Sequence, residues 1–215
     1  METFNTIVRF FQQGGLFMYP IVVVLAIGVT IAVERWVFLS VTSTRNKQLW
    51  KKLVPMIQHG RFQEAAAVTS KSKTAIASIL SYGLARIETA RRRDDIEQAM
   101  EESLMEVLPR LEKRTHYLAT FANIATLLGL LGTIIGLIKA FTAVAAANPA
   151  EKADLLSASI SVAMNTTAFG LMVAIPLLFV HTLLQTKTTE LIDSLEMVSV
   201  KFLNSVSEQR TAKAA

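Results

Sequence analysis

The stretch THYLATFANIATLLGLLGTIIGLI, residues 115–138, contains no Asp, Glu, Lys or Arg. Two further windows share this property, residues 10–33 and residues 155–186. All 22 basic and 17 acidic residues of the 215-residue chain lie outside these windows. A helix of about 20 predominantly apolar residues crosses a bilayer core, and each window reaches that length. The sequence therefore predicts an all-α integral membrane protein with three transmembrane helices.

The composition excludes several other classes of protein. Only 18% of the residues are charged and the mean hydropathy is +0.41, whereas soluble domains average about 25% charged. The chain has no cysteine, and its three histidines, His59, His116 and His181, are scattered. Disulfide scaffolds, thiol catalysis and cysteine-ligated metals are thereby excluded. We expect no catalytic residues, no metal and no cofactor.

The distribution of basic residues predicts the orientation of the chain. Residues 34–114 contain 15 of the 22 Lys and Arg residues, and cytoplasmic loops carry such an excess. The first window is followed by Glu34 and Arg35 without a small-residue cleavage site, which favours a retained span over a cleaved signal peptide. The expected segments are a periplasmic N-terminus at 1–15, a first span at 16–39, a cytoplasmic helical region at 40–114, a second span at 115–141, a periplasmic loop at 142–154, a third span at 155–186 and a cytoplasmic helical tail at 187–215.

The cytoplasmic parts are expected to be helical extensions of the spans. Residues 49–57 and 62–68 have the pattern of short helices. Asp94 and Asp95 are placed to cap a further helix, which is expected to continue into the second span with a kink at Pro109. The tail repeats apolar residues at helical spacing, namely Leu191, Leu195, Val198, Phe202 and Val206. The run of Arg91, Arg92 and Arg93 has acidic neighbours and is typical of a solvated helix start, with a phosphate or anionic-lipid contact as the alternative.

Small residues recur at helical spacing in the second and third windows. Because such residues let membrane helices approach closely, they predict tight packing of these two helices. The residues concerned are Gly129, Gly132 and Gly136 in the second window and Ala163, Gly170 and Ala174 in the third.

Polar but uncharged side chains lie near the middle of the same two windows. Thr126 and Thr133 share one face of the second helix, and Asn165, Thr166 and Thr167 are expected at a similar depth in the third. Such groups are costly in lipid unless they are paired or hydrated. These five residues are therefore candidates for a proton pathway or a pore lining.

The windows lack a carboxylate that a proton pathway would need. If the chain conducts protons, we expect the carboxylate to come from a partner helix. His181 is the one ionisable histidine well inside a span, where it either serves proton transfer or packs. Glu34, beside Arg35 at the end of the first span, is a candidate for a local ion pair or a gating role.

Two motifs resemble those of a known family. Gly129-Leu-Leu-Gly-Thr-Ile-Ile-Gly136 and Asn165-Thr-Thr-Ala-Phe-Gly-Leu-Met-Val-Ala-Ile-Pro176 are similar to the second-span and third-span motifs of the ExbB/TolQ/MotA proton channel family. ExbB and TolQ are the nearer members, because MotA has four spans. The family often carries a glutamate five residues before the third-span threonine, and this chain has Val162 at that position.

The resemblance implies a function and partners. It implies a homopentameric proton channel of the bacterial inner membrane that takes part in ion and protein transport within a TonB-type system. The ring would enclose the single helices of ExbD/TolR-type partners, each carrying a titratable aspartate. The proton motive force would then drive energy transduction to a TonB/TolA-type periplasm-spanning protein. Thr133 and Thr167 correspond to the family threonines that line the cavity.

Two alternatives remain open on the sequence alone. One is a non-conducting structural scaffold in the membrane, because the small-residue stripes alone would suffice for it. The other is a TolQ- or MotA-type stator relative that drives a different load. A secondary transporter is disfavoured because the spans show no inverted repeat. No nucleic acid is expected as a partner, because the positive-inside rule explains the basic excess.

Overall fold

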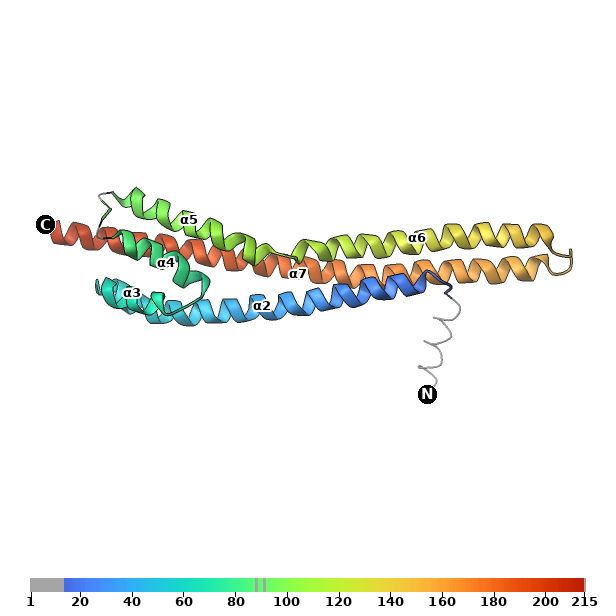
Figure 1. Cartoon of the computed structure of the whole chain (residues 1–215), viewed down its shortest axis with the longest axis horizontal. Helices are drawn as coiled ribbons and strands as arrows, with labels where there is room; N and C mark the ends of the chain where they lie inside the picture. Colours follow the sequence, from blue (N-terminus) through green and yellow to red (C-terminus); the bar gives the residue numbers. More distant parts are fainter. Residues whose placement is uncertain (1–13, 88, 91, 215) are drawn as a thin grey trace, which may run out of the picture. The chain divides into compact units, whose positions relative to one another are not determined.

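The computed structural model describes residues 14–87, 89–90 and 92–214 (Figure 1). These residues form helices joined by short turns and contain no strand. In chain order the helices are α2 (Met18–Gln58), α3 (Phe62–Ser70), α4 (Ala75–Arg86), α5 (Arg93–Glu112), α6 (Thr115–Ala146) and α7 (Lys152–Ala214). Helix α7 runs without interruption through Pro176. The all-α fold class is thus confirmed for the described residues.

The helices divide between two compact units. The first unit combines the described residues up to Glu34 with Arg114–Leu183, and the second combines Arg35–Lys113 with the chain from Leu184 onward. The first unit therefore contains the start of α2, all of α6 and the first half of α7. The second contains the rest of α2 and α7 together with α3, α4 and α5.

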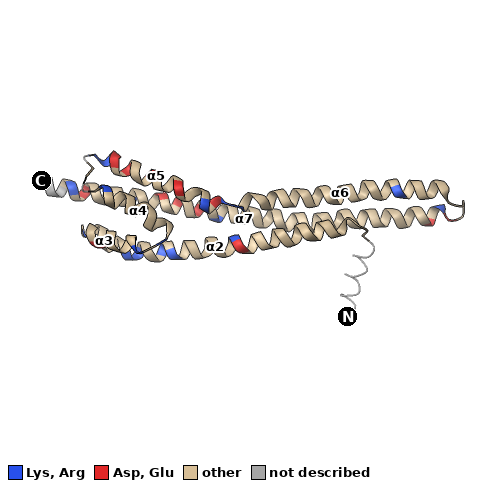
Figure 2. Cartoon of the chain, viewed as in Figure 1, with Lys and Arg blue, Asp and Glu red and all other residues tan. Residues whose placement is uncertain are grey.

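The first unit holds the apolar parts of the three long helices. Three helical segments are long and apolar enough to cross a membrane, with window hydropathies of 2.2, 2.1 and 2.0. Figure 2 shows that α6 and the first half of α7 are almost entirely tan, the colour of residues other than Lys, Arg, Asp and Glu. Only 28%, 22% and 28% of the three apolar windows are buried within the chain. Most of their apolar surface is therefore left for lipid or for other protein helices to cover.

The second unit is held together by an ordinary hydrophobic core. The apolar tail residues Leu191, Leu195, Val198, Phe202 and Val206 are all buried, as the helical spacing predicts. The Phe202 ring meets Phe62 of α3 edge to face, with centroids 6.5 Å apart. A Cβ on Gly83 would lie 2.9 Å from the Phe202 ring, so α4 approaches α7 closely at this glycine. The small helices thus pack around the C-terminal half of α7.

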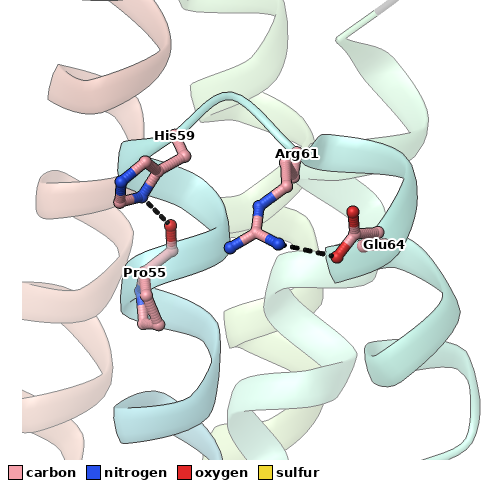
Figure 3. Close-up of polar contacts among 4 residues, drawn as sticks. All are labelled: Pro55, His59, Arg61 and Glu64. Carbon is pink, nitrogen blue, oxygen red and sulfur yellow. Dashed lines mark hydrogen bonds and ion pairs between the residues drawn. The ribbon is translucent and has the colours of Figure 1, made fainter.

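The end of α2 is fixed by a left-handed glycine and by local polar contacts. Gly60 adopts a left-handed φ of 71°, and the following Arg61 N–H donates to the Met56 carbonyl at 2.9 Å. His59 Nδ1 lies 2.7 Å from the Pro55 carbonyl oxygen, and Arg61 pairs with Glu64 at 3.3 Å (Figure 3). A glycine in this conformation is the common way to terminate a helix.

Two expectations about the helices are wrong. Residues 49–57 are not a separate short helix but the last turns of α2. The helix through Leu111 does not continue into the second span, because α5 ends at Glu112 and Arg114 takes a left-handed φ of 68° before α6 begins. Pro109 stays inside α5 and does not set the break. Asp95 does contribute to the start of α5, since its carboxylate accepts from the Arg92 N–H at 3.1 Å.

We predict that Gly60→Ala destabilises the second unit by about 1–2 kcal/mol. A Cβ in the left-handed region costs about 1 kcal/mol, and it would also lie 2.7 Å from Gln209 Oε1. Gln209 Nε2 donates to the Ile57 carbonyl at 2.7 Å, so displacing this side chain loses a bond that caps α2. Thermal unfolding in detergent, followed by helical circular dichroism, measures the change. Gly60→Asn should be milder because asparagine tolerates this φ, and an equal loss for both variants would contradict the conformational explanation.

Candidate functional site

Helices α6 and α7 approach one another closely at two glycines. A Cβ built on Gly129 would lie 3.2 Å from the Thr167 Cα and 3.3 Å from the Gly170 Cα. A Cβ built on Gly170 would lie only 2.7 Å from the Ala125 carbonyl oxygen and 3.0 Å from the Gly129 Cα. All four of these neighbours are backbone atoms, which cannot rotate away. The two helices are therefore in direct backbone contact at this point.

The same contact extends along α6 toward its C-terminal end. A Cβ on Gly132 would lie 2.4 Å from Thr166 Cγ2, and one on Gly136 would lie 2.8 Å from Ala163 Cβ. Ala163 is 2% exposed. The stripe of small residues on α6 thus faces small residues on α7. Ala174, one turn beyond Gly170, is also buried at 2% exposure.

Thr167 forms a hydrogen bond between the two helices. Its hydroxyl donates to the Gly129 carbonyl at 2.8 Å. Thr167 itself is half-buried. A side-chain hydroxyl reaches the backbone of a neighbouring helix only where the backbones approach closely, and the glycine contact provides that approach.

Thr133 and Thr126 lie on the same face of α6, beside the glycine stripe. The Thr133 hydroxyl donates to the Leu130 carbonyl at 2.5 Å, and the Thr126 hydroxyl donates to the Ala122 carbonyl at 3.1 Å. Both bonds are made within the helix itself. Thr133 is half-buried and Thr126 is exposed. Thr133 is one residue beyond Gly132, which packs on Thr166, so it lies within about one helical turn of the level of Thr167.

Thr166 points away from Thr167 and contacts the start of the described chain. Its hydroxyl lies 2.6 Å from the Gly14 carbonyl and 3.0 Å from the Val162 carbonyl. Thr166 is 2% exposed. The pattern of the sequence did not indicate the Gly14 partner, because a backbone carbonyl leaves no signature in residue type.

Asn165 and Val162 do not join the cluster around Thr167. Asn165 lies two residues before Thr167, about 200° around the helix, and it is half-buried. Val162 lies beside Gly15, whose Cβ would be 3.3 Å from Val162 Cγ1. His181, further along α7, is half-buried. The structure thus brings Thr167 to the backbone of α6 and places Asn165 on a different side of α7.

The two charged residues at the end of the first charge-free window, Glu34 and Arg35, contact different parts of the chain. Glu34 forms an ion pair with Arg114, whose Nη1 lies 3.3 Å from Glu34 Oε2. Arg35 is 3% exposed, and its guanidinium donates to the Leu111 carbonyl and lies 4.7 Å from the Phe38 ring centroid. The ion pair that the structure gives Glu34 is thus with Arg114, whereas the sequence favoured a local pair with Arg35. The Arg114 partner was detectable in principle, because Arg114 directly precedes the second window as Glu34 directly follows the first.

Comparison with known proteins shows which family the sequence matches. Residues 71–197 match the family model described as the MotA/TolQ/ExbB proton channel family. An ExbB homologue of Methanothermobacter thermautotrophicus, assigned to biopolymer transport, is 28% identical over 91% of this chain and 68% of its own. The biopolymer transport protein exbB1 of Vibrio cholerae is 29% identical over 77% of this chain and 73% of its own. The Tol-Pal system protein TolQ of Haemophilus influenzae is 35% identical over 37% of this chain and 34% of its own.

We predict that Gly170→Ala and Gly28→Ala differ in effect although each adds one methyl group. The new methyl on Gly170 meets backbone of α6, so the helices must separate, at a cost of about 1–3 kcal/mol. On Gly28 it meets the Cδ atoms of Leu177, at 2.8 and 3.0 Å, and these belong to a side chain that can shift. Gly28→Ala should therefore change stability by less than about 1 kcal/mol. Unfolding midpoints in one detergent compare the two, and equal losses would contradict the backbone contact.

We also predict unequal roles for Glu34 and Arg35. Arg35→Met leaves the Leu111 carbonyl without its charged donor and should destabilise the second unit by about 1.5–3 kcal/mol. The side chains of the Glu34 and Arg114 pair are 43% and 50% exposed, and exposed pairs contribute at most about 1 kcal/mol. The free energy of unfolding of Glu34→Gln should therefore lie within about 1 kcal/mol of that of the native chain. A larger loss in Glu34→Gln than in Arg35→Met would contradict this assignment.

Proposed function

Because the chain belongs to the MotA/TolQ/ExbB proton channel family, we propose that it is an ExbB-like subunit of a proton-driven motor. Family membership and three apolar helices support a multi-pass protein of the inner membrane. The proposed role is to convert the proton motive force into mechanical work on a partner protein. This is a transport-associated role and not an enzymatic one.

The observation that carries this proposal is the hydroxyl-bearing contact between α6 and α7. Thr167 bonds to the Gly129 carbonyl at 2.8 Å, and Thr133 lies about one turn away on α6. Both threonines are half-buried, within helices whose apolar windows contain no charged residue. Hydroxyl oxygens in such surroundings can accept a hydrogen bond from an acid without adding a charge to the membrane. We assign Thr133 and Thr167 to the pore lining, with Thr126 beside them.

The titratable group is proposed to come from a partner. Residues 115–138 and 155–186 contain no Asp or Glu, while proton-conducting paths need an ionisable group. A single-span partner of the ExbD/TolR type, carrying an aspartate on its helix, would supply that group. The names of the relatives refer to biopolymer transport and to the Tol-Pal system. They support a periplasm-spanning element of the TonB/TolA type as the load.

The exposed apolar surface supports assembly into a ring. Leu127, Ile138 and Phe141 of α6 are 63%, 60% and 63% exposed, and lipid or neighbouring copies must cover them. We propose a homopentamer whose α6 and α7 helices surround the partner helices. The basic residues between the first and second windows favour a cytoplasmic placement of that segment. The N-terminus would then be periplasmic and the C-terminus cytoplasmic.

A non-conducting scaffold remains the second candidate. Its supporting observation is that the Thr167 and Thr133 hydroxyl protons are both already donated to carbonyls. If these bonds serve packing alone, the small-residue contact accounts for the whole interface. A TolQ-type stator with a different load is a variant of the first candidate, supported by the 79 residues that match TolQ.

The test compares threonine variants in the chain co-expressed with an ExbD/TolR-type partner. Thr167→Val should reduce proton-driven work by roughly tenfold or more, because loss of a proton-relay group typically costs at least that much. Thr167→Ser keeps a hydroxyl and should retain most activity. Thr142→Val is the matched control, because the Thr142 hydroxyl bonds only to Ile138 of its own helix. The measurement is uptake or force generation before and after an uncoupler is added.

Assembly must be measured in the same samples. Co-purification of the partner should be equal for all three variants, so that a loss of activity reports on proton transfer. Normal activity in Thr167→Val would reject the proposed role of this hydroxyl. Activity of the native chain that persists after the uncoupler would instead favour the scaffold.

A further inference from the structure

A polar pocket lies between α2 and α7 within the second unit. Its volume is about 320 Å³, and its apolar floor is formed by the buried residues Leu39 and Leu191. Around this floor stand hydroxyl groups and two lysines, from Ser40, Ser43, Ser194, Thr44, Lys47 and Lys187. Glu190 is the one acidic residue of the lining. This volume is at the lower end of the range for small-molecule sites.

The pocket begins where the apolar runs of both helices end. On α2 the charge-free window ends before Glu34, and Ser40 follows six residues later, about 9 Å along the helix. On α7, Lys187 is the first charged residue after the window 155–186. On α2, Trp36 lies between Glu34 and Ser40 in the sequence. The Lys187 Nζ is 3.5 Å from the centroid of the Trp36 ring. Tryptophan and lysine are the residues that mark the level of lipid headgroups.

The donors of the pocket match the oxygens of a phosphate. Lys187 Nζ donates to Ser40 Oγ at 3.4 Å, which leaves the Ser40 hydroxyl proton available. Among the described residues, the Ser43 hydroxyl makes no hydrogen bond, and Lys47 is exposed beside it. Two ammonium groups and two hydroxyl donors thus surround a space with one carboxylate. Phosphate oxygens accept strong hydrogen bonds from donors of this kind.

From these contacts we propose that the pocket binds the phosphate of an anionic phospholipid headgroup. The position of the pocket, just beyond the ends of two charge-free windows, favours a lipid over a soluble phosphate ester. Val37 and Val41, which are 54% and 42% exposed, offer apolar surface on α2 for the acyl chains. Basic pockets beside membrane helices bind anionic headgroups in this way. The proposal does not depend on whether the chain conducts protons.

The test is lipid binding to the full-length chain, purified in a neutral detergent. Binding of phosphatidylglycerol is measured by native mass spectrometry, with phosphatidylcholine as the uncharged comparison. The double variant Lys47→Gln/Lys187→Gln should weaken phosphatidylglycerol binding by roughly tenfold or more, because each basic residue near the lipid contributes appreciably. The matched control is Lys51→Gln/Lys52→Gln, which removes the same charge from exposed positions on α2 outside the pocket. It should change binding by less than about twofold.

A gain-of-binding variant keeps the test independent of folding. Glu190→Gln removes the one acidic group of the pocket and should strengthen phosphatidylglycerol binding by about threefold or more. Glu196→Gln, an exposed change outside the pocket, should have no such effect. Equal losses in the two lysine pairs would overturn the pocket as the site. Displacement of the lipid by millimolar glycerol phosphate would overturn the assignment to a lipid and identify a soluble phosphate ester as the ligand.

Discussion

Helices in lipid gain nothing from hiding apolar surface from each other, because lipid tails are as apolar as leucine. Their association must come from close packing and from hydrogen bonds. The contact at Gly129 and Gly170 meets both needs, since the absence of side chains lets the backbones touch. The Thr167 hydroxyl can reach the Gly129 carbonyl only because of that approach. The geometry of the candidate pore lining therefore depends on glycine, which has no side chain, at positions 129 and 170.

The charged residues at the ends of the apolar segments make contacts between helices. Glu34 pairs with Arg114 in the first unit, and Arg35 caps the end of α5 in the second. These adjacent residues on α2 thus act on different units. Arg114 also carries the left-handed conformation that separates α5 from α6. Helix α5 is charged and helix α6 is apolar, although the two follow one another in sequence. Because of this break, each helix keeps its own packing face.

Much of the fold could be predicted from the sequence, because charge is excluded from lipid for a simple energetic reason. The three windows, the small-residue stripes and the buried tail face around Phe202 all follow from periodicity and polarity. The break at Arg114 could not be predicted, since neither Lys113 nor Arg114 is a residue that ends helices and the Glu34 contact is tertiary. In the candidate site, Thr167 was found by residue type. The separation of Asn165 from Thr167 follows from their two-residue spacing on a helix. The Gly14 partner of Thr166 depends on packing that one sequence does not encode visibly.

The Thr167 hydroxyl has a single proton, which it donates in a hydrogen bond to the Gly129 carbonyl. The oxygen therefore presents only lone pairs to its remaining surroundings. An oxygen in that state attracts a carboxylic acid, which has a proton to share, and repels a bare carboxylate. The hydrogen bond that joins two helices thus also makes the threonine a discriminator between the two ionisation states of an acid, without any charge of its own.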